Sequence, residues 1–333
     1  MGWAHAGDME RTVLVLGATG GVGGETAAAL LARGWKVRAL HRHPESVAAS
    51  EPGIEWVKGD AMDAASVRAA AEGGGSGALP PRRVSVIVHA VNPPGYKNWQ
   101  GLALPMLEST IAAARAVGAR IVFPGTVYNF GPEVLPRVRE TSAQTPRTKK
   151  GAIRVAMEKR LRESGVRVLV VRAGDFFGAR AKNSWFSQGL VQPGKPVKRV
   201  LYPGAREVGH AWAYLPDLAR TIALLLEREG LPPVATYHFR GHWFERGVTI
   251  AEATARIGGV RNARVWAFPW FVIYLLAPFL ETFREMIEMR WLWKQPLELV
   301  NDELVAFLGE EPHTPLDRAV RETLEGLDCL TPG

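Results

Sequence analysis

Three glycines near the start of the chain have the spacing of a phosphate-binding turn. Gly17, Gly20 and Gly23 lie three residues apart and follow an apolar run, Thr12–Leu16. One glycine allows the tight turn off a strand, one lets the backbone approach a pyrophosphate, and one lets the next helix pack closely. The helix formers that follow would direct free N–H groups at an anion. This strand, turn and helix predict a dinucleotide-binding site.

The end of the next predicted strand, Trp35–Leu40, bears on which dinucleotide is bound. His41, Arg42 and His43 follow this strand, and the first acidic residue is Glu45. An acidic side chain would hydrogen-bond the ribose 2′-hydroxyl of NAD, whereas an arginine accommodates the 2′-phosphate of NADP. Arg42 therefore favours NADP, with NAD as the other choice. In the alternative interpretation, Arg42 is a solvated loop residue.

Strands and helices alternate along the first two thirds of the chain. Apolar runs predict further strands at 54–58, 84–89, 120–124, 166–172 and 236–240. Periodic patterns predict helices at 63–71, 106–116, 150–164, 215–229 and 249–257. Thr249 with Glu252 predicts a capping box, and Thr314-Pro315 should start the last helix in the same way.

This alternation implies right-handed βαβ units. We predict an α/β fold, a Rossmann-type doubly wound parallel sheet with a smaller, mainly helical C-terminal domain. The expected NAD(P)-binding domain comprises 9–180 and 211–240. The C-terminal substrate or lid domain comprises 181–210 and 241–330.

The composition is that of an ordinary globular protein. Of 333 residues, 47% are hydrophobic and 22% charged, and the single cysteine, Cys329, leaves no disulfide framework and no cysteine-based metal site. Residues 1–8 lack the apolar core of a signal peptide, so we expect a cytoplasmic protein. The net charge is +8, but the basic residues are spread along the chain without a nucleic-acid motif. We therefore expect neither a metal nor a nucleic-acid partner.

Five short motifs resemble those of one family. They are GATGGVG at 17–23, the turn Gly59-Asp60, Val127-Tyr128, Arg172-Ala173-Gly174, and the helix start at 214–219. With them the chain resembles the extended short-chain dehydrogenase/reductases, which include nucleotide-sugar epimerases and dehydratases, from about residue 11 to 240. The resemblance implies that Asp60 lies near the adenine. The cofactor-binding residues we expect are Gly17, Thr19, Gly20, Gly21, Val22, Gly23, Arg42, Asp60, Ala90, Val91 and Arg154.

The positions that carry the family's chemistry are altered in this chain. That chemistry uses a Ser or Thr, together with a Tyr and a Lys that lie four residues apart on one helix. Aligning Glu158 with the glutamate that usually follows the tyrosine puts Lys150 at the tyrosine and Arg154 at the lysine. Residues 124–125 then fall at the serine, with Thr126 nearby.

Four residues are therefore candidates for the altered active site. Arg154 could still hold the ribose hydroxyls as a fixed donor. Lys150 could donate a proton, or lose its charge if buried, or be a solvated lysine in a basic run. Tyr128 and Thr126 are substitute candidates for proton transfer, although Tyr128 could instead only pack.

The second half offers two substrate-related features. Asn92 follows the fourth strand, and Lys195 and Arg206 belong to a basic Pro/Gly-rich loop where related epimerases hold a diphosphate. These three are the expected substrate-binding residues, and the alternative for the loop is simple solvation. The aromatic segment 265–293 is too short and proline-broken for a membrane span. It could be a pocket lid, a subunit contact or a membrane-surface helix. Its amphipathic pattern favours a lid that covers the substrate pocket, and that pocket would then be apolar and aromatic.

These features predict an NAD(P)-dependent oxidoreductase or epimerase/dehydratase-like enzyme with a non-standard active site. Its substrate would be a small carbonyl or hydroxyl compound or a nucleotide sugar. The alternative is an NAD(P)-binding sensor without turnover, like the nitrogen-regulator-type members of the superfamily. The helices after Leu102 and Lys150 could supply the contact of a homodimer.

Overall fold

Seven parallel strands form the central sheet of the computed structural model, which describes residues 11–73, 83–93 and 99–330. The strands are β1 (Thr12–Leu16), β2 (Lys36–His41), β3 (Ile54–Lys58), β4 (Val86–His89), β5 (Arg120–Thr126), β7 (Arg167–Ala173) and β11 (Val234–His238). Their spatial order is β11-β7-β5-β4-β1-β2-β3. The chain thus reverses direction across the sheet between β1 and β4, the place where doubly wound folds bind their ligands.

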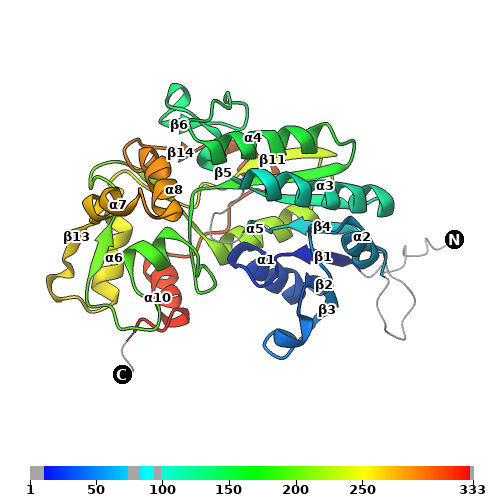
Figure 1. Ribbon diagram of the computed structural model, residues 1–333, viewed down its shortest axis with the longest axis horizontal. Coiled ribbons are helices and arrows are strands. Elements are labelled where there is room, and N and C mark those ends of the chain that lie inside the picture. Colours follow the sequence, from blue (N-terminus) through cyan, green and yellow to red (C-terminus); the bar gives the residue numbers. More distant parts are fainter. Residues whose placement is uncertain (1–10, 74–82, 94–98, 331–333) are drawn as a thin grey trace.

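Helices cover both faces of this sheet (Figure 1). They are α1 (Gly21–Ala32), α2 (Ala64–Glu72), α3 (Trp99–Val117), α4 (Lys149–Arg162), α5 (Leu215–Glu227) and α9 (Asp302–Leu308). Side chains of β1 alternate between the two faces, as a strand requires. Val13 and Val15 pack with α1, α5 and α9, whereas Leu14 and Leu16 pack with α2 and α3. Two buried cores therefore hold the sheet from opposite sides.

The C-terminal part forms a second, mainly helical unit on the left of Figure 1. Its helices are α6 (Thr249–Ile257), α7 (Trp270–Leu276), α8 (Glu281–Met289) and α10 (Leu316–Gly326). Its short strands are β8 (Asp175–Phe177), β9 (Val200–Tyr202), β10 (His210–Tyr214), β12 (His242–Phe244) and β13 (Val265–Ala267), with β6 (Arg137–Val138) and β14 (Glu298–Leu299) pairing nearby. A core rich in aromatic side chains joins them, including Phe177, Trp212 and Trp293.

The predicted fold class is confirmed, whereas both predicted helix caps are wrong. Helix α6 does begin at Thr249, but its N-cap residue is Val248, and the Thr249 hydroxyl donates to the Arg246 carbonyl at 2.6 Å. The last helix begins at Leu316, after Pro315. Thr314 instead donates its N–H and hydroxyl to the Asp217 carboxylate, at 2.6 and 2.8 Å. The Thr249 hydroxyl thus bonds the turn before its helix, and Thr314 bonds a distant helix, so neither side chain caps the helix that follows it.

No helix among the described residues has the length and apolarity needed to cross a membrane.

Candidate functional site

A cavity of about 610 Å³ lies along the carboxyl edge of the sheet. The ends of β1, β2, β4 and β5 open into it, together with β8 and the segment that follows β8. The predicted cofactor and catalytic residues that line it are Gly17, Thr19, Gly20, Gly21, Val22, Arg42, Asp60, Ala90, Val91, Thr126, Tyr128 and Arg154, and the predicted substrate residue Asn92 lines it too. Residues far apart in the sequence thus converge on one concave site.

The glycine turn has the geometry expected of a phosphate cradle. Gly17 adopts φ +90°, and a Cβ there would lie 2.6 Å from the Ala90 carbonyl oxygen. A Cβ at Gly23 would lie 2.2 Å from the Gly17 oxygen, so this glycine packs α1 against the strand. No side chain in the described part of the chain caps the start of α1 at Gly20. The first N–H groups of α1 therefore face the cavity ready for an anion.

The far end of the cavity carries the two groups expected around the adenosine. Arg42 is exposed immediately after β2 and lines the cavity. Asp60 also lines it, and its carboxylate accepts the Met62 N–H at 2.9 Å. An extended dinucleotide that lies with its pyrophosphate on the glycine turn would reach this end. The turn, the helix start and these side chains together fit an NAD(P) molecule.

Arg154 is held as a rigid donor on the other side of the cavity. It is buried, and its guanidinium donates to Asn92 Oδ1 at 2.8 Å and to the Pro124 carbonyl at 3.4 Å. It also stacks over the rings of Trp99 and Phe123, each 5.2 Å from the ring centre. These contacts hold the planar guanidinium in one orientation at the cavity wall.

His89 at the end of β4 is buried and neutral. Burial, reinforced by the Arg154 guanidinium, lowers the pKa of His89 to about 3. Its Nδ1 lies 2.8 Å from the Thr110 hydroxyl, which itself donates to the Met106 carbonyl at 3.0 Å. The hydroxyl therefore accepts from His89, so the proton of this imidazole is on Nδ1. His89 supports the strand end rather than carrying charge into the site.

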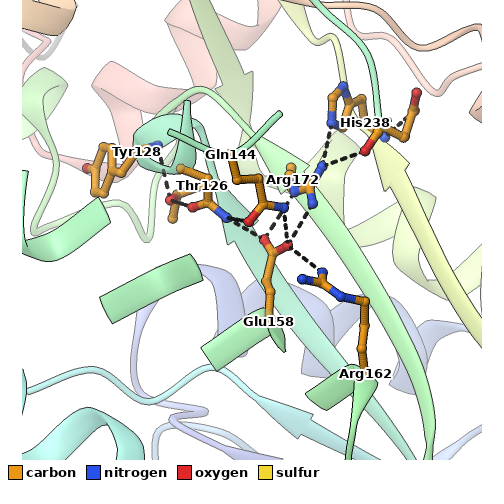
Figure 2. Close-up of polar contacts among 9 residues, drawn as sticks. Thr126, Tyr128, Gln144, Glu158, Arg162, Arg172 and His238 are labelled. Atoms are coloured by element: carbon orange, nitrogen blue, oxygen red, sulfur yellow. Dashed lines mark hydrogen bonds and ion pairs between the residues drawn. The ribbon is translucent and has the colours of Figure 1, made fainter. Parts of the chain in front are cut away.

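A buried network behind the site positions Thr126 and Tyr128 (Figure 2). The Glu158 carboxylate accepts two bonds from Arg172, at 2.6 and 3.0 Å, and one from Asn129 at 2.8 Å. Burial raises the pKa of Glu158, but the Arg172 hydrogen bonds and charge outweigh it, so the net direction is downward. Asn129 then accepts the Thr126 hydroxyl at 3.3 Å. The carboxylate thus stays ionised and anchors the turn after β5.

The side chain of Tyr128 lies on the cavity side of this turn. Its backbone N–H donates to the Thr126 hydroxyl at 3.3 Å, which fixes the two residues relative to each other. Figure 2 shows the Tyr128 ring pointing away from Glu158 and Arg172. Its phenol is therefore separate from the buried network, and Tyr128 and Thr126 both line the cavity.

Lys150 occupies a different environment from the other three catalytic candidates, Thr126, Tyr128 and Arg154. Its side chain is 3% exposed and forms an ion pair with Glu285 of α8. The solvated alternative for this lysine is therefore wrong. Lys150 is not among the residues that line the cavity, although it lies in the first turn of the helix that carries Arg154.

Comparison with known proteins agrees with this site. Residues 17–197, more than half of the chain, match the NAD(P)H-binding family. The chain belongs to this NAD(P)H-binding family. In sequence, none of the curated proteins matches the chain.

Solved structures of epimerases share the fold. UDP-glucuronic acid 4-epimerase from Bacillus cereus in complex with NAD is 13% identical with a TM-score of 0.72, covering 95% of this chain and 96% of that one. UDP-N-acetylglucosamine 4-epimerase from the same organism is 15% identical with a TM-score of 0.70, over 97% and 98%. UDP-glucose 4-epimerase from Bifidobacterium longum, in complex with NAD+ and UDP, is 16% identical with a TM-score of 0.68, over 95% and 98%. The NAD(P)H-binding chain therefore has the architecture of the extended short-chain dehydrogenase/reductases.

The two basic residues expected to hold a substrate diphosphate lie elsewhere. Arg206 lines a second hollow, and its guanidinium donates to Glu252 at 2.8 Å. Lys195 is exposed on the loop after Leu190 and, like Arg206, is not among the residues lining the large cavity. Asn92 does line that cavity and accepts from Arg154. Of the three expected substrate residues, one faces the cofactor site.

Sequence reasoning missed a polar pair at the cavity wall. Asp175 lines the cavity, and its carboxylate lies 2.7 Å from His210 Nε2 on the neighbouring strand β10. The His210 ring stacks on Trp293 with centroids 4.0 Å apart. Trp185, another lining residue, meets the same indole at 5.4 Å. Because His210 and Asp175 are 35 residues apart, only the pairing of β8 with β10 brings them together.

Other lining residues also escaped notice. Arg180 lies beside the start of α1, where a Cβ on Gly24 would come within 3.2 Å of its side chain, and it pairs with Glu51. Trp99, Leu102 and Met106 of α3 and Phe176 of β8 add apolar and aromatic side chains to the cavity lining. Among the residues that the structure describes, no group of three or more His, Cys, Asp and Glu could hold a metal ion.

Proposed function

We propose that the protein is an NADP-dependent oxidoreductase that acts on a small carbonyl or hydroxyl compound. The observation that carries this proposal is the convergence of a phosphate-binding glycine turn with Tyr128 and Thr126 on one cavity. When bound, the nicotinamide cofactor would accept or supply the hydride. The residues of this chain would bind it, orient it and move the accompanying proton.

The choice of NADP over NAD is supported by Arg42. Its exposed guanidinium follows β2, where a 2′-phosphate would lie, and its fork geometry suits phosphate oxygens. Asp60, the acidic side chain at this end, already accepts a backbone N–H in its own turn. We therefore assign Arg42 to the 2′-phosphate and Asp60 to the adenine edge.

We assign proton transfer to Tyr128. Thr126 would hydrogen-bond the substrate oxygen once its hydroxyl, which donates to Asn129 Oδ1 at 3.3 Å in this structure, turns toward the cavity. Reduction of a carbonyl would take one proton from the phenol, and oxidation of a carbinol would return one to it. Arg154 would orient the ribose through donors that Asn92 and two aromatic rings hold in place. Lys150 would act on the site through α4 and its ion pair with α8, as a positioning residue.

The lining favours a neutral substrate with an apolar body over a nucleotide sugar. Trp99, Phe176 and Trp185 line the cavity, and Asp175 adds a carboxylate that would repel a diphosphate. The nucleotide-sugar alternative is supported by the architecture shared with the epimerases named above. The carboxylate of Asp175, bound by His210, would accept a hydroxyl or amine donor of the substrate.

The competing function is a sensor that binds NAD(P) without turnover, and the altered positions 150 and 154 favour it. Binding of NADPH and NADH to the purified protein, followed by nicotinamide fluorescence, separates cofactor preference from catalysis. A panel of carbonyl compounds is then screened for NADPH oxidation, and UDP-glucose and UDP-glucuronic acid for conversion by chromatography. Turnover of a carbonyl compound supports the proposal, and conversion of a UDP-sugar supports the epimerase alternative. Tight binding without any turnover supports the sensor, whereas absence of binding overturns all three.

A further inference from the structure

Exposed apolar side chains gather on α7 and on the turn that follows it. Phe271, Leu275 and Phe279 are 74%, 71% and 81% exposed. Other exposed large apolar side chains on this segment are Trp266, Tyr274, Leu276 and Leu280. In the rest of the described chain such side chains are scattered, at Met62, Val234 and Val305. We call residues 266–280 the α7 surface, and a patch of this kind marks an interaction site.

The inner face of α7 is firmly packed, so the exposed face is not a result of loose folding. Trp270 and Ile273 are buried in the aromatic core, and the Trp270 indole donates to the Pro203 carbonyl at 2.8 Å. The Trp270 ring lies 5.9 Å from Trp185, which lines the cofactor cavity. Only one face of α7 therefore packs against the protein as expected for a lid. The other face remains apolar and uncovered.

Basic side chains contact the α7 surface. Arg264 lies over the Trp266 ring at 3.9 Å, Arg290 donates to the Tyr274 hydroxyl at 2.8 Å, and Arg284 donates to the Ala277 carbonyl at 3.1 Å. Over the described ranges, none of the three forms an ion pair, although arginines on other surfaces do, such as Arg33, Arg160 and Arg240.

Two of the three acidic side chains of the adjoining helix α8 contact α4 and not the α7 surface. Glu285 pairs with Lys150, and Glu288 accepts the Lys149 N–H, so both face α4. Glu281, in the first turn of α8, is the remaining acidic residue on this helix. The α7 surface is therefore apolar at its centre and positively charged at its edge (orange in Figure 1).

We propose that the α7 surface docks onto an anionic lipid bilayer. Apolar side chains at the centre would enter the boundary of the acyl chains, and the arginines would meet anionic headgroups. Tryptophan and tyrosine are typical of this depth. A symmetric contact between two copies is disfavoured, because it would bring the arginines of both copies together. The protein would lie on the membrane rather than span it. This proposal does not depend on the reaction proposed above, because docking needs neither cofactor nor turnover.

Co-sedimentation with vesicles tests the proposal on the full chain. Wild-type protein is mixed with vesicles of phosphatidylcholine, and with vesicles that contain about one quarter phosphatidylglycerol. We expect binding to the anionic vesicles that weakens as salt is raised. The variant Phe271→Ser/Leu275→Ser/Phe279→Ser should lower the partition coefficient at least about tenfold. Arg264→Gln/Arg284→Gln, which removes two of the arginines at the edge of the α7 surface, should reduce binding to anionic vesicles only.

Val305→Ser is the matched control, since it removes an exposed apolar side chain outside the patch. Circular dichroism and NADPH fluorescence establish that each variant is folded with its cofactor site intact. Wild-type protein that stays in the supernatant with both vesicle types overturns the proposal. Light scattering provides a second way to overturn it. A wild-type dimer that the triple variant converts to a monomer would make the α7 surface a contact between copies instead.

Discussion

The ammonium group of Lys150 in α4 forms an ion pair with the carboxylate of Glu285 in α8. The neighbouring Glu288 accepts the backbone N–H of Lys149 at the start of α4. Both contacts join the helix that carries Arg154 to the aromatic C-terminal segment. Lys150, which the sequence alignment predicts to stand at the family's catalytic tyrosine, therefore connects two parts of the molecule.

Removal of one partner of this pair should destabilise the protein. Glu285→Gln leaves the buried Lys150 ammonium without its counter-charge, so the free energy of unfolding should fall by about 2 kcal/mol, less than for a fully buried pair because Glu285 is partly exposed. The double variant Lys150→Met/Glu285→Leu should recover most of this loss. Urea unfolding followed by circular dichroism measures both.

Glu108→Gln is the control for this prediction, since it breaks the more exposed ion pair between Glu108 and Arg160. It should cost less than about 1 kcal/mol. If Glu285→Gln lowers the free energy of unfolding no more than Glu108→Gln does, the burial of the Lys150–Glu285 pair adds nothing to stability.

Arg42 should determine the cofactor preference. Arg42→Ala removes the donor assigned to the 2′-phosphate, so the Kd of NADPH should rise at least about tenfold while that of NADH changes little. Fluorescence titration with both cofactors measures the two effects. Lys58→Ala removes a positive charge from the end of the adjacent strand β3 without altering the cavity wall, and it should leave both Kd values unchanged. Equal losses for the two cofactors in Arg42→Ala would refute the NADP assignment.

The central sheet and the cofactor half of the site were predictable because their signals are local. Gly17 and Gly23 are required by contacts within one strand, turn and helix, where a Cβ would meet backbone oxygens. Apolar strands in a parallel sheet are likewise visible as short runs. Local reasoning failed at Thr249, whose hydroxyl serves the Arg246 carbonyl and not the start of its own helix.

The substrate half depends on contacts between distant segments, which no local pattern reveals. Asp175 meets His210 because β8 and β10 pair, and Lys150 meets Glu285 across 135 residues. The exposure of Phe271 could not be predicted either, because α7 is apolar on both faces and its periodicity does not say which face is buried.

His238 should make stability depend on pH. Burial, together with the Arg172 guanidinium, lowers the pKa of His238 to about 3. Its Nε2 lies 3.1 Å from Arg172 Nη1 and its Nδ1 lies 3.2 Å from the Val138 carbonyl, so the folded ring is neutral (Figure 2). The unfolded chain binds a proton below its ordinary pKa of about 6.5, whereas the folded chain does not until about 3. Stability is therefore lost as the pH falls through this window.

Urea unfolding between about pH 5 and pH 6.5 measures this loss in a range where most carboxylates remain ionised. His238→Gln keeps an acceptor for Arg172 but cannot titrate, so the proton uptake on unfolding should decrease by about one. Burial lowers the pKa values of His89 and His242 to about 3 and about 4. These two histidines should therefore still contribute to the slope of the unfolding free energy against pH. An unchanged slope in His238→Gln would show that this histidine is not neutral in the folded protein.

Tyr128 should be required for turnover but not for cofactor binding. Tyr128→Phe removes the phenol assigned to proton transfer while the backbone N–H that donates to Thr126 remains. With the carbonyl substrate found in the screen, kcat should fall at least about tenfold, since positioned acid–base groups contribute that much or more. The Kd of NADPH should stay within about twofold, because Arg42, Arg154 and the glycine turn are untouched. Tyr237→Phe makes the same chemical change outside the cavity wall and should leave kcat unaltered. Full activity in Tyr128→Phe would move the proton transfer to another residue of the cavity, with Thr126 and Asp175 the next to be substituted.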